Sequence, residues 1–187
     1  MSVASVNIVS PNGYGTDYYL RSFYGQDRGY IVSSTRAGAT DSKLSVADSH
    51  ALKKALDSIE LSTEKEDEEA RTQIAAYADT FNNLLSSSTE ISNRDIRNVR
   101  VKMKELNKEY ADELEKIGVS VSASGKLKIT KSTLSEATAE KISQVFGKDT
   151  DYAKEMETYM KKMERLTTAN KLKEDSIRKA RSIDVQI

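Results

Sequence analysis

The residues that could carry chemistry in this 187-residue chain are few: it has one histidine, His50, and no cysteine. The absence of cysteine excludes disulfides, thiolate nucleophiles and Cys-ligated metal sites, and one histidine gives little basis for a Ser-His-Asp triad or a multi-histidine centre. We interpret His50 as an ordinary exposed or capping residue, because neither a second histidine nor a cysteine can act with it. The sequence therefore predicts a protein that is not an enzyme, without catalytic, cofactor-binding or metal-ligating residues.

Paired carboxylates occur, but in a setting that suits a solvated helix. Glu105 and Glu109 lie one helical turn apart and alternate with Lys102, Lys104 and Lys108. Such alternation indicates a salt-bridged exposed face and not an acid/base pair. The chain has 29 basic and 29 acidic residues, a balance that argues against a binder of nucleic acid or anionic membrane. We expect no cofactor and no small-molecule substrate, and protein subunits as the partners.

Tyrosines near the N-terminus form the first group of candidate partner-binding residues. Residues 1–41 contain five of the nine tyrosines and lack a helical or strict two-residue period, so we interpret them as an irregular Tyr/Gly-rich arm, with one short strand near residues 30–32. The candidates are Tyr14, Tyr18, Tyr19 and Tyr24. Their rings either lie against the rest of the protein or belong to a disordered arm that orders on a partner.

A methionine row forms the second group. Met156, Met160 and Met163 lie on one side of a predicted helix. Such a row either fills the core as adaptable packing or offers a face to an amphipathic partner helix, and both alternatives stay open.

Apolar residues recurring at three and four predict long helices. These are residues 42–60, 64–86, 92–118 and 149–183. Helix starts are assigned to side-chain caps at Thr63, Ser92 and Thr133, the last of which opens a short helix or a pair of turns. The apolar seam of the terminal helix is interrupted at Asn170 and Lys173 before Ile177 and Ala180 resume it. Polar residues on a seam weaken it but specify partner or register.

The alternating segment 119–130 predicts a β-hairpin. A two-residue turn would mix its apolar and polar faces. A three-residue loop, with Gly125 in the left-handed conformation, pairs Val119 with Ile129 and Val121 with Leu127 on one apolar face. A lone hairpin is marginal in water, so this face must lie on the helices.

Together these elements predict a mainly α fold, an elongated antiparallel, coiled-coil-like bundle with a small β-hairpin. The arm of residues 1–41 precedes the bundle of residues 42–187, which carries the hairpin at 119–130. With 31% charged residues, 37% hydrophobic residues and one proline, the composition favours long helices with narrow apolar stripes. Helix 92–118 is expected to pack along the terminal helix, since their seams are similar in length.

Residues 110–147 contain a series of short motifs that resembles a known family. A helix ends in Leu114-Glu-Lys-Ile117-Gly118-Val119, then come Gly125-Lys-Leu-Lys-Ile129, Leu134 as the first anchor of a short helix, and Val145-Phe146. This order resembles the C-terminal region of flagellar filament-cap proteins (hook-associated protein 2). Upstream, the run from Tyr77 to Leu85 is similar to a helix of that family, and the long terminal helix also fits. The resemblance covers residues 70–187 and corresponds to the helical stem.

The resemblance implies a structural, self-assembling protein of the bacterial flagellum or a related appendage. Such a protein would be exported without a cleaved signal peptide, act outside the cell or at its surface, and bind other protein subunits, possibly copies of itself, through its termini and helical seams. The alternative is a cytoplasmic helical adaptor or chaperone-like module that holds an amphipathic partner helix against the methionine row.

Overall fold

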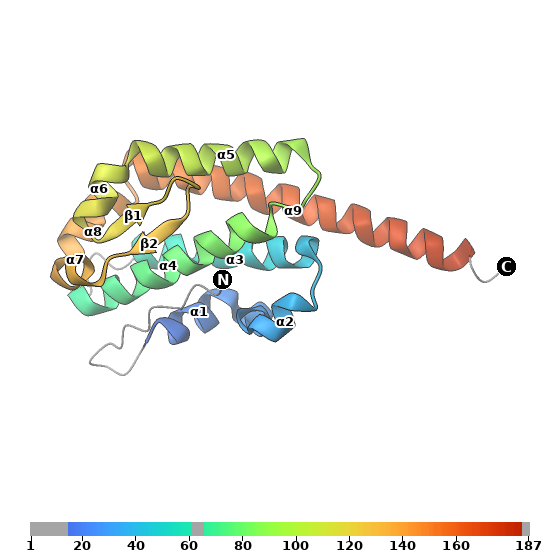
Figure 1. Cartoon of the computed structure of the whole chain (residues 1–187), viewed down its shortest axis with the longest axis horizontal. Coiled ribbons are helices and arrows are strands. Elements are labelled where there is room, and N and C mark those ends of the chain that lie inside the picture. Colours follow the sequence, from blue (N-terminus) through green and yellow to red (C-terminus); the bar gives the residue numbers. More distant parts are fainter. Residues whose placement is uncertain (1–14, 61–65, 185–187) are drawn as a thin grey trace.

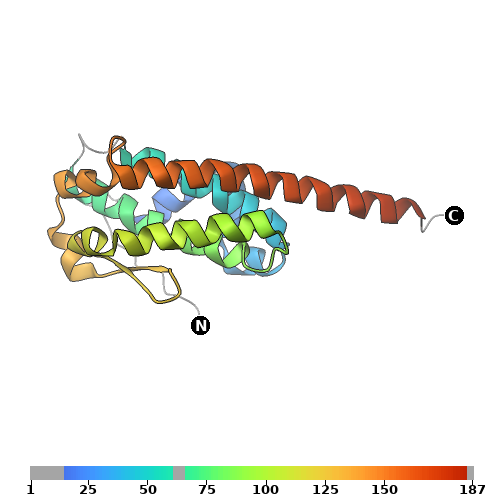
Figure 2. The ribbon, with the colours of Figure 1, turned by 90° about the horizontal axis from the view of Figure 1, so that it is seen from above.

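The computed structural model describes residues 15–60 and 66–184, and within them the protein is mainly α with one small antiparallel sheet, as predicted. Four helices form the body of an elongated bundle (Figures 1 and 2). They are α3 (Asp41–Glu60), α4 (Asp67–Ser87), α5 (Arg94–Glu109) and α9 (Asp151–Asp184). The short elements α6 (Ala111–Lys116), β1 (Val119–Val121), β2 (Leu127–Ile129), α7 (Lys131–Glu136) and α8 (Ala139–Phe146) gather at one end.

Helix α9 packs against both α3 and α5, and α3 also packs against α4. The predicted pairing of helix 92–118 with the terminal helix is confirmed and antiparallel, since Lys102 lies over the ring of Tyr159 while Tyr152 donates a hydrogen bond to Asn107. Helix α3 is also antiparallel to α9, because Ser49 contacts Thr167 and Ser42 contacts Asn170.

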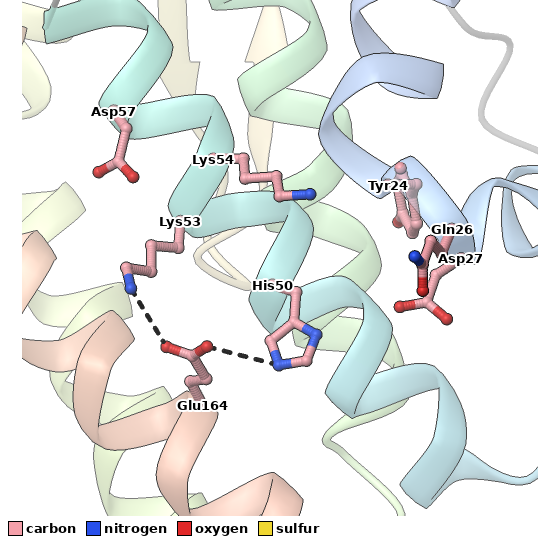
Figure 3. A pocket seen from close by; sticks show the side chains of 9 residues that line it. Tyr24, Gln26, Asp27, His50, Lys53, Lys54, Asp57 and Glu164 are labelled. Atoms are coloured by element: carbon pink, nitrogen blue, oxygen red, sulfur yellow. Dashed lines mark ion pairs between the residues drawn. The ribbon is translucent and has the colours of Figure 1, made fainter.

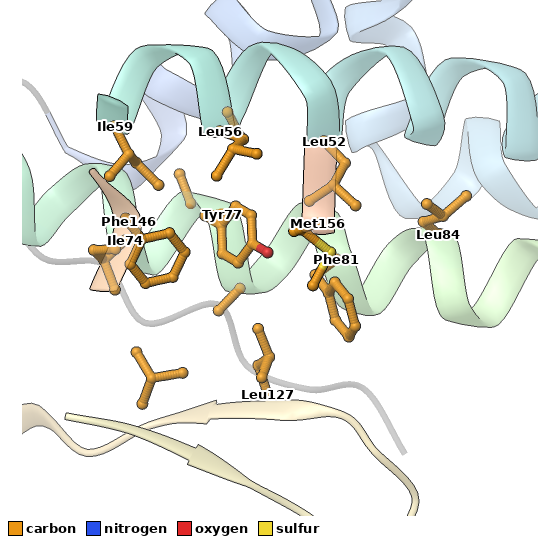
Figure 4. Close-up of a cluster of buried hydrophobic side chains, with 14 of the residues drawn as sticks. Leu52, Leu56, Ile59, Ile74, Tyr77, Phe81, Leu84, Leu127, Phe146 and Met156 are labelled. Carbon is orange, nitrogen blue, oxygen red and sulfur yellow. The ribbon is translucent and has the colours of Figure 1, made fainter. Parts of the chain in front are cut away.

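The core lies between α3, α4 and α9 (Figure 4). Leu52, Leu56 and Ile59 of α3 face the row formed by Ile74, Tyr77, Phe81 and Leu84 of α4, and all of them are buried. Phe146 of α8 and Met156 of α9 complete this layer. Each such side chain contributes about 1.5–3 kcal/mol by leaving water. The helical spacing of the apolar residues therefore determines which faces meet.

The predicted irregular structure at residues 16–37 is wrong. The segment forms α1 (Thr16–Tyr24), a 3-10 helix η1 (Gly25–Ile31) and α2 (Ser33–Ala37). In α1 the apolar residues Tyr19, Leu20, Phe23 and Tyr24 recur at three and four and are buried against α3 and α4. This packing stabilises a nine-residue helix that would be marginal alone. The short strand predicted near residues 30–32 is also wrong, because Tyr30 and Ile31 belong to η1 and Val32 is its C-cap.

The hairpin register is confirmed: Val119 pairs with Ile129 and Val121 with Leu127. Gly125 has φ +81°, the left-handed conformation that the three-residue loop requires. Asn82 of α4 holds the free edge of β2, accepting a hydrogen bond from the Leu127 N–H (2.9 Å) and donating one to the Leu127 carbonyl (2.7 Å). The amide side chain thus pairs with the strand as a neighbouring backbone would.

Several helix ends differ from the predictions. Predicted helix 92–118 divides at Tyr110 into α5 and α6, and α6, which contains the buried Leu114, packs against β1. The N-cap of α5 is Asn93, not Ser92, because the Asn93 side chain accepts hydrogen bonds from the N–H groups of residues 95 and 96. Helix α7 begins at Lys131, so Thr133 lies inside it and caps nothing. The predicted cap at Thr63 lies outside the described residues.

Candidate functional site

The distal part of α9 is the most distinctive surface of the fold. Helix α9 has 34 residues and is about 51 Å long, whereas α3 has 20 residues and is about 30 Å long. Ser42, in the first turn of α3, contacts Asn170, so the N-terminal end of α3 lies beside Asn170 of α9. From Ser176 to Arg181 every α9 residue is exposed. Figures 1 and 2 show this end of α9 projecting beyond the other helices. We call residues 176–184 the α9 overhang.

Apolar side chains remain exposed on and beside the overhang. Leu172 is 60% exposed and Ile177 is 45% exposed, and Ala180 is also exposed. Ile177 and Ala180 continue the seam on which Leu166 packs against the core. The apolar seam predicted from the sequence therefore does continue past residue 170. In the described structure, however, no helix of this chain covers that part of the seam.

Charges at the base of the overhang are locally paired. Asn170 donates to Ser42 at 3.1 Å and to Glu174 at 2.8 Å, which joins α9 to α3. Lys171 donates to Asp175 at 2.6 Å and lowers the pKa of that carboxyl group. The polar residue Asn170 on the seam thus marks where α9 leaves the bundle.

The candidate tyrosines do not form one surface. Tyr18 is 49% exposed, whereas Tyr19 and Tyr24 are buried, and Tyr14 lies outside the described residues. Tyr19 donates a hydrogen bond to Glu69 of α4 at 2.9 Å. For Tyr19 and Tyr24 the interpretation that the rings lie against the rest of the protein is confirmed, because α1 must bury its aromatic face.

The methionine row is part of the core. Met156, Met160 and Met163 are all buried, packed among the helices that surround α9. A face for a partner helix would have to be exposed, so the packing interpretation of this row is confirmed and the partner-helix alternative loses its binding surface. The reason is that α3 and α5 approach α9 from two sides and cover the row.

A buried ion pair that sequence reasoning missed fixes the N-terminal helices to the bundle. Asp48 is fully buried and accepts two hydrogen bonds from the Arg36 guanidinium, at 2.8 and 2.9 Å. Tyr24 and Ser87 donate to the same carboxylate, each at 2.6 Å. Burial and the adjacent Asp48 charge raise the pKa of Tyr24. The sequence does contain an indication of this buried carboxylate, because Asp48 lies four residues from Leu44 and from Leu52, on the apolar side of its helix.

A cleft of about 670 Å³ lies between the N-terminal segment, α3 and α9 (Figure 3). Glu164 reaches into it from α9 and pairs with His50 at 3.4 Å and with Lys53 at 3.6 Å. Asp57 lies on the same wall, and its pKa is raised, chiefly by desolvation. His50 is thus a partly exposed residue whose side chain contacts Glu164, so that α3 and α9 meet here.

The half-buried carboxyl group of Asp79 has a raised pKa. Desolvation raises the pKa of Asp79 to about 6, and the nearby Asp17 of α1 adds to the rise. This pair lies where α1 crosses α4. Asp79 therefore lies in the contact between α1 and the bundle, and we expect its protonation to affect the stability of that contact.

Among residues 15–60 and 66–184, no three His, Asp or Glu side chains are grouped so that they could hold a metal ion. None of the described helices combines the length and the hydropathy needed to cross a bilayer. A scan against protein-family models, a search of curated proteins and a search of solved structures each found no match to this chain.

Proposed function

We propose that this chain is a non-enzymatic assembly protein that binds other protein subunits through the exposed distal part of α9. The observation that carries the proposal is the exposure of Leu172 and Ile177 on a helix that extends past its own bundle. These two side chains lie on different sides of the helix, and an apolar side chain exposed beyond the bundle is available for contact with another chain.

The bundle supports this function as a rigid base. The Asn170 contacts to Ser42 and Glu174 fix where α9 leaves the bundle and restrict its direction. A preorganised helix loses less conformational entropy on binding than a flexible tail. The resemblance to flagellar filament-cap stems favours the same function, with assembly in an appendage outside the cell.

The test is site-specific photo-crosslinking in the cells that produce the protein. A photoreactive residue at position 172 or 177 should crosslink to a defined protein subunit, identified by mass spectrometry. The matched control is position 101, because Val101 of α5 is 43% exposed on the body of the bundle. Equal crosslinking from all three positions, or none at 172 and 177, would contradict the proposal.

A further inference from the structure

We infer that the protein has a second interaction surface, on α5 and the tip of the hairpin, which binds an acidic segment of a partner protein. We call this surface the basic face, and it consists of Arg97, Arg100, Lys104 and Lys108 of α5 and Lys126 of the hairpin. It does not include distal α9, so the inference goes beyond the proposed function.

Four of these cations follow one another along one side of α5. Arg97 lies three residues before Arg100, and then Lys104 and Lys108 follow at intervals of four. Side chains at these spacings are neighbours on the helix surface, and like charges there destabilise a helix. The row extends over about 17 Å. It is therefore unfavourable in the isolated chain and becomes favourable when carboxylates face it.

The hairpin adds a fifth cation from a distant part of the sequence. Its tip lies beside α5 (Figure 1), and a Cβ added at Gly125 would be 2.6 Å from Cγ of Lys104. This contact places the exposed Lys126 next to the row. Desolvation lowers the pKa of Lys104. Further lowering comes from three cations, Arg100, Lys108 and Lys126, so the charges that act on this ammonium group are all positive.

The acidic residues of α5 lie on its other side, although acidic and basic residues alternate in the sequence. Lys102 lies over the ring of Tyr159 of α9, and Asp95 and Glu109 are seven residues before and after Lys102, which places them on the same side of the helix. Burial raises the pKa of Tyr159, and nearby carboxylates, those of Glu105 and Glu109 among them, add to the rise. These carboxylates therefore face α9 and not the basic face.

One carboxylate does lie near the basic face. Desolvation and the neighbouring Arg97 lower the pKa of Arg100, and Glu90 of the loop between α4 and α5 opposes them only in part. Within residues 15–60 and 66–184, none of the five cations comes within ion-pair distance of a carboxylate. The basic face therefore keeps an excess of positive charge.

A hollow at the start of α5 suits a carboxylate group. It has a volume of about 310 Å³ and is lined by Arg97, Arg100 and the loop that joins α4 to α5. Arg100 donates a hydrogen bond to the Ser88 carbonyl, which holds its guanidinium group in place. Guanidinium groups bind carboxylates through charge-assisted hydrogen bonds. An Asp or Glu side chain of the partner would enter this hollow while its neighbours face the lysines of the row.

An acidic protein segment fits the basic face better than other polyanions do. None of the five cationic residues alternates with an aromatic side chain on which the bases of a single-stranded nucleic acid could stack. The chain has 29 basic and 29 acidic residues, so it lacks the net positive field that attracts DNA or an anionic membrane. The exposed Val101 borders the row and offers an apolar contact to a protein segment.

Fluorescence anisotropy of the purified full chain tests the inference. The probe is a labelled peptide of Glu and Ala, long enough to span the row, and the wild-type chain should bind it at low salt with a dissociation constant on the order of 100 µM. A peptide with Gln in place of Glu should bind at least about tenfold more weakly. Equal binding of the two peptides would overturn the inference.

Charge reversal tests which cations bind the peptide. Lys104→Glu and Lys126→Glu should each weaken binding at least about fivefold. Lys102→Glu is the matched control, because it makes the same change of charge on the other side of α5, and it should bind within about twofold of wild type. Circular dichroism confirms that each variant is folded. Equal affinities of the three variants would overturn the inference.

Removal of the nearby carboxylate tests the hollow. Glu90→Gln should bind the acidic peptide at least about twofold more tightly than wild type, because Glu90 competes for Arg100. Equal or weaker binding by Glu90→Gln would contradict the placement of a carboxylate of the partner beside Arg100.

Other occupants are separated by titrations at the same salt concentration. Tighter binding of oligothymidylate, or of vesicles that contain phosphatidylserine, than of the acidic peptide would assign the basic face to a nucleic acid or a membrane and overturn the inference. Self-association of the wild-type chain that Lys104→Glu abolishes would assign the face to a second copy of this chain and would also overturn it.

Failure of this inference and failure of the proposed function can be told apart. Lys104→Glu should leave the cellular crosslink from position 172 unchanged, and loss of that crosslink would contradict a separate second surface. Position 101 borders the basic face. A crosslink from position 101 to a subunit other than the one captured at position 172 would therefore support the second surface and leave the proposed function intact.

Discussion

Arg36 and Asp48 form a two-point ion pair, with both terminal guanidinium nitrogens, Nη1 and Nη2, within 2.9 Å of the buried carboxylate. The pair joins the N-terminal helices to α3. A buried charge is stable only when it is paired and hydrogen-bonded, and Asp48 also receives hydrogen bonds from Tyr24 and Ser87. This carboxylate is therefore the central polar contact through which α1, η1 and α2 remain attached.

Replacing Arg36 should be costly. Arg36→Ala leaves Asp48 buried without its counter-ion, and we expect a loss of about 3–5 kcal/mol in the free energy of unfolding. Urea denaturation measures the loss. Arg28→Ala is the control, because Arg28 is exposed in the same segment and its removal should change stability by less than about 0.5 kcal/mol. Equal effects of the two changes would show that the ion pair has no special importance.

Asn82 should determine how strongly the Leu127 amide of the hairpin is protected from hydrogen exchange. In Asn82→Ala the Leu127 N–H and carbonyl lose their partners, so we expect destabilisation of about 1–3 kcal/mol. Hydrogen exchange at the Leu127 amide should accelerate. Asn98→Ala on the exposed side of α5 serves as the control, and its Leu127 amide should exchange at the wild-type rate. Unchanged exchange in Asn82→Ala would mean that α4 does not hold β2.

The methionine row should behave as core. Met156→Ala removes a buried side chain and should cost about 2–5 kcal/mol, measured by urea denaturation. Lys162→Ala, on the exposed side of the same helix, should change stability by less than about 0.5 kcal/mol. A fully stable Met156→Ala protein would instead mean that this row is not packed as the structure has it.

Stability should decrease between about pH 4 and pH 6 through Asp79. Its pKa is raised to about 6 in the folded state, so its protonated form stabilises the fold at low pH, and this contribution is lost as the pH rises. Asp57 also has a raised pKa and acts in the same direction. Asp79→Asn should be more stable than wild type at pH 7 by about 1–3 kcal/mol, with a smaller gain at pH 4. Urea midpoints across this range measure the change, and a constant difference would contradict it.

The overhang should be separable from the fold. Ile177→Glu changes a side chain that no helix of the described residues covers, so the free energy of unfolding of the monomer should stay within about 0.5 kcal/mol of wild type. Dilute urea titrations measure it. Leu52→Glu, in the core of α3, should prevent folding and provides the contrast. Severe destabilisation by Ile177→Glu would make position 177 part of the core.

The sequence by itself determined what depends on local spacing. The four long helices, the apolar seams and the pairing of Val119 with Ile129 follow from residues that are neighbours along the chain, because periods of 3.6 and 2 determine which side chains share a face. Gly125 in the hairpin loop was predictable for the same reason, since a left-handed position favours glycine.

Only the tertiary structure decided which faces are covered. Whether the methionine row was core or binding surface depended on the approach of α3 and α5, and the helices at residues 16–37 depended on burial against α3 and α4. The position of Asp48 on an apolar helix face indicated that its carboxylate has a buried partner. Only the tertiary structure identifies that partner as Arg36. The overhang appears only when the length of α9 is compared with that of its neighbours. Such contacts join residues far apart in sequence, and local periodicity contains no information about them.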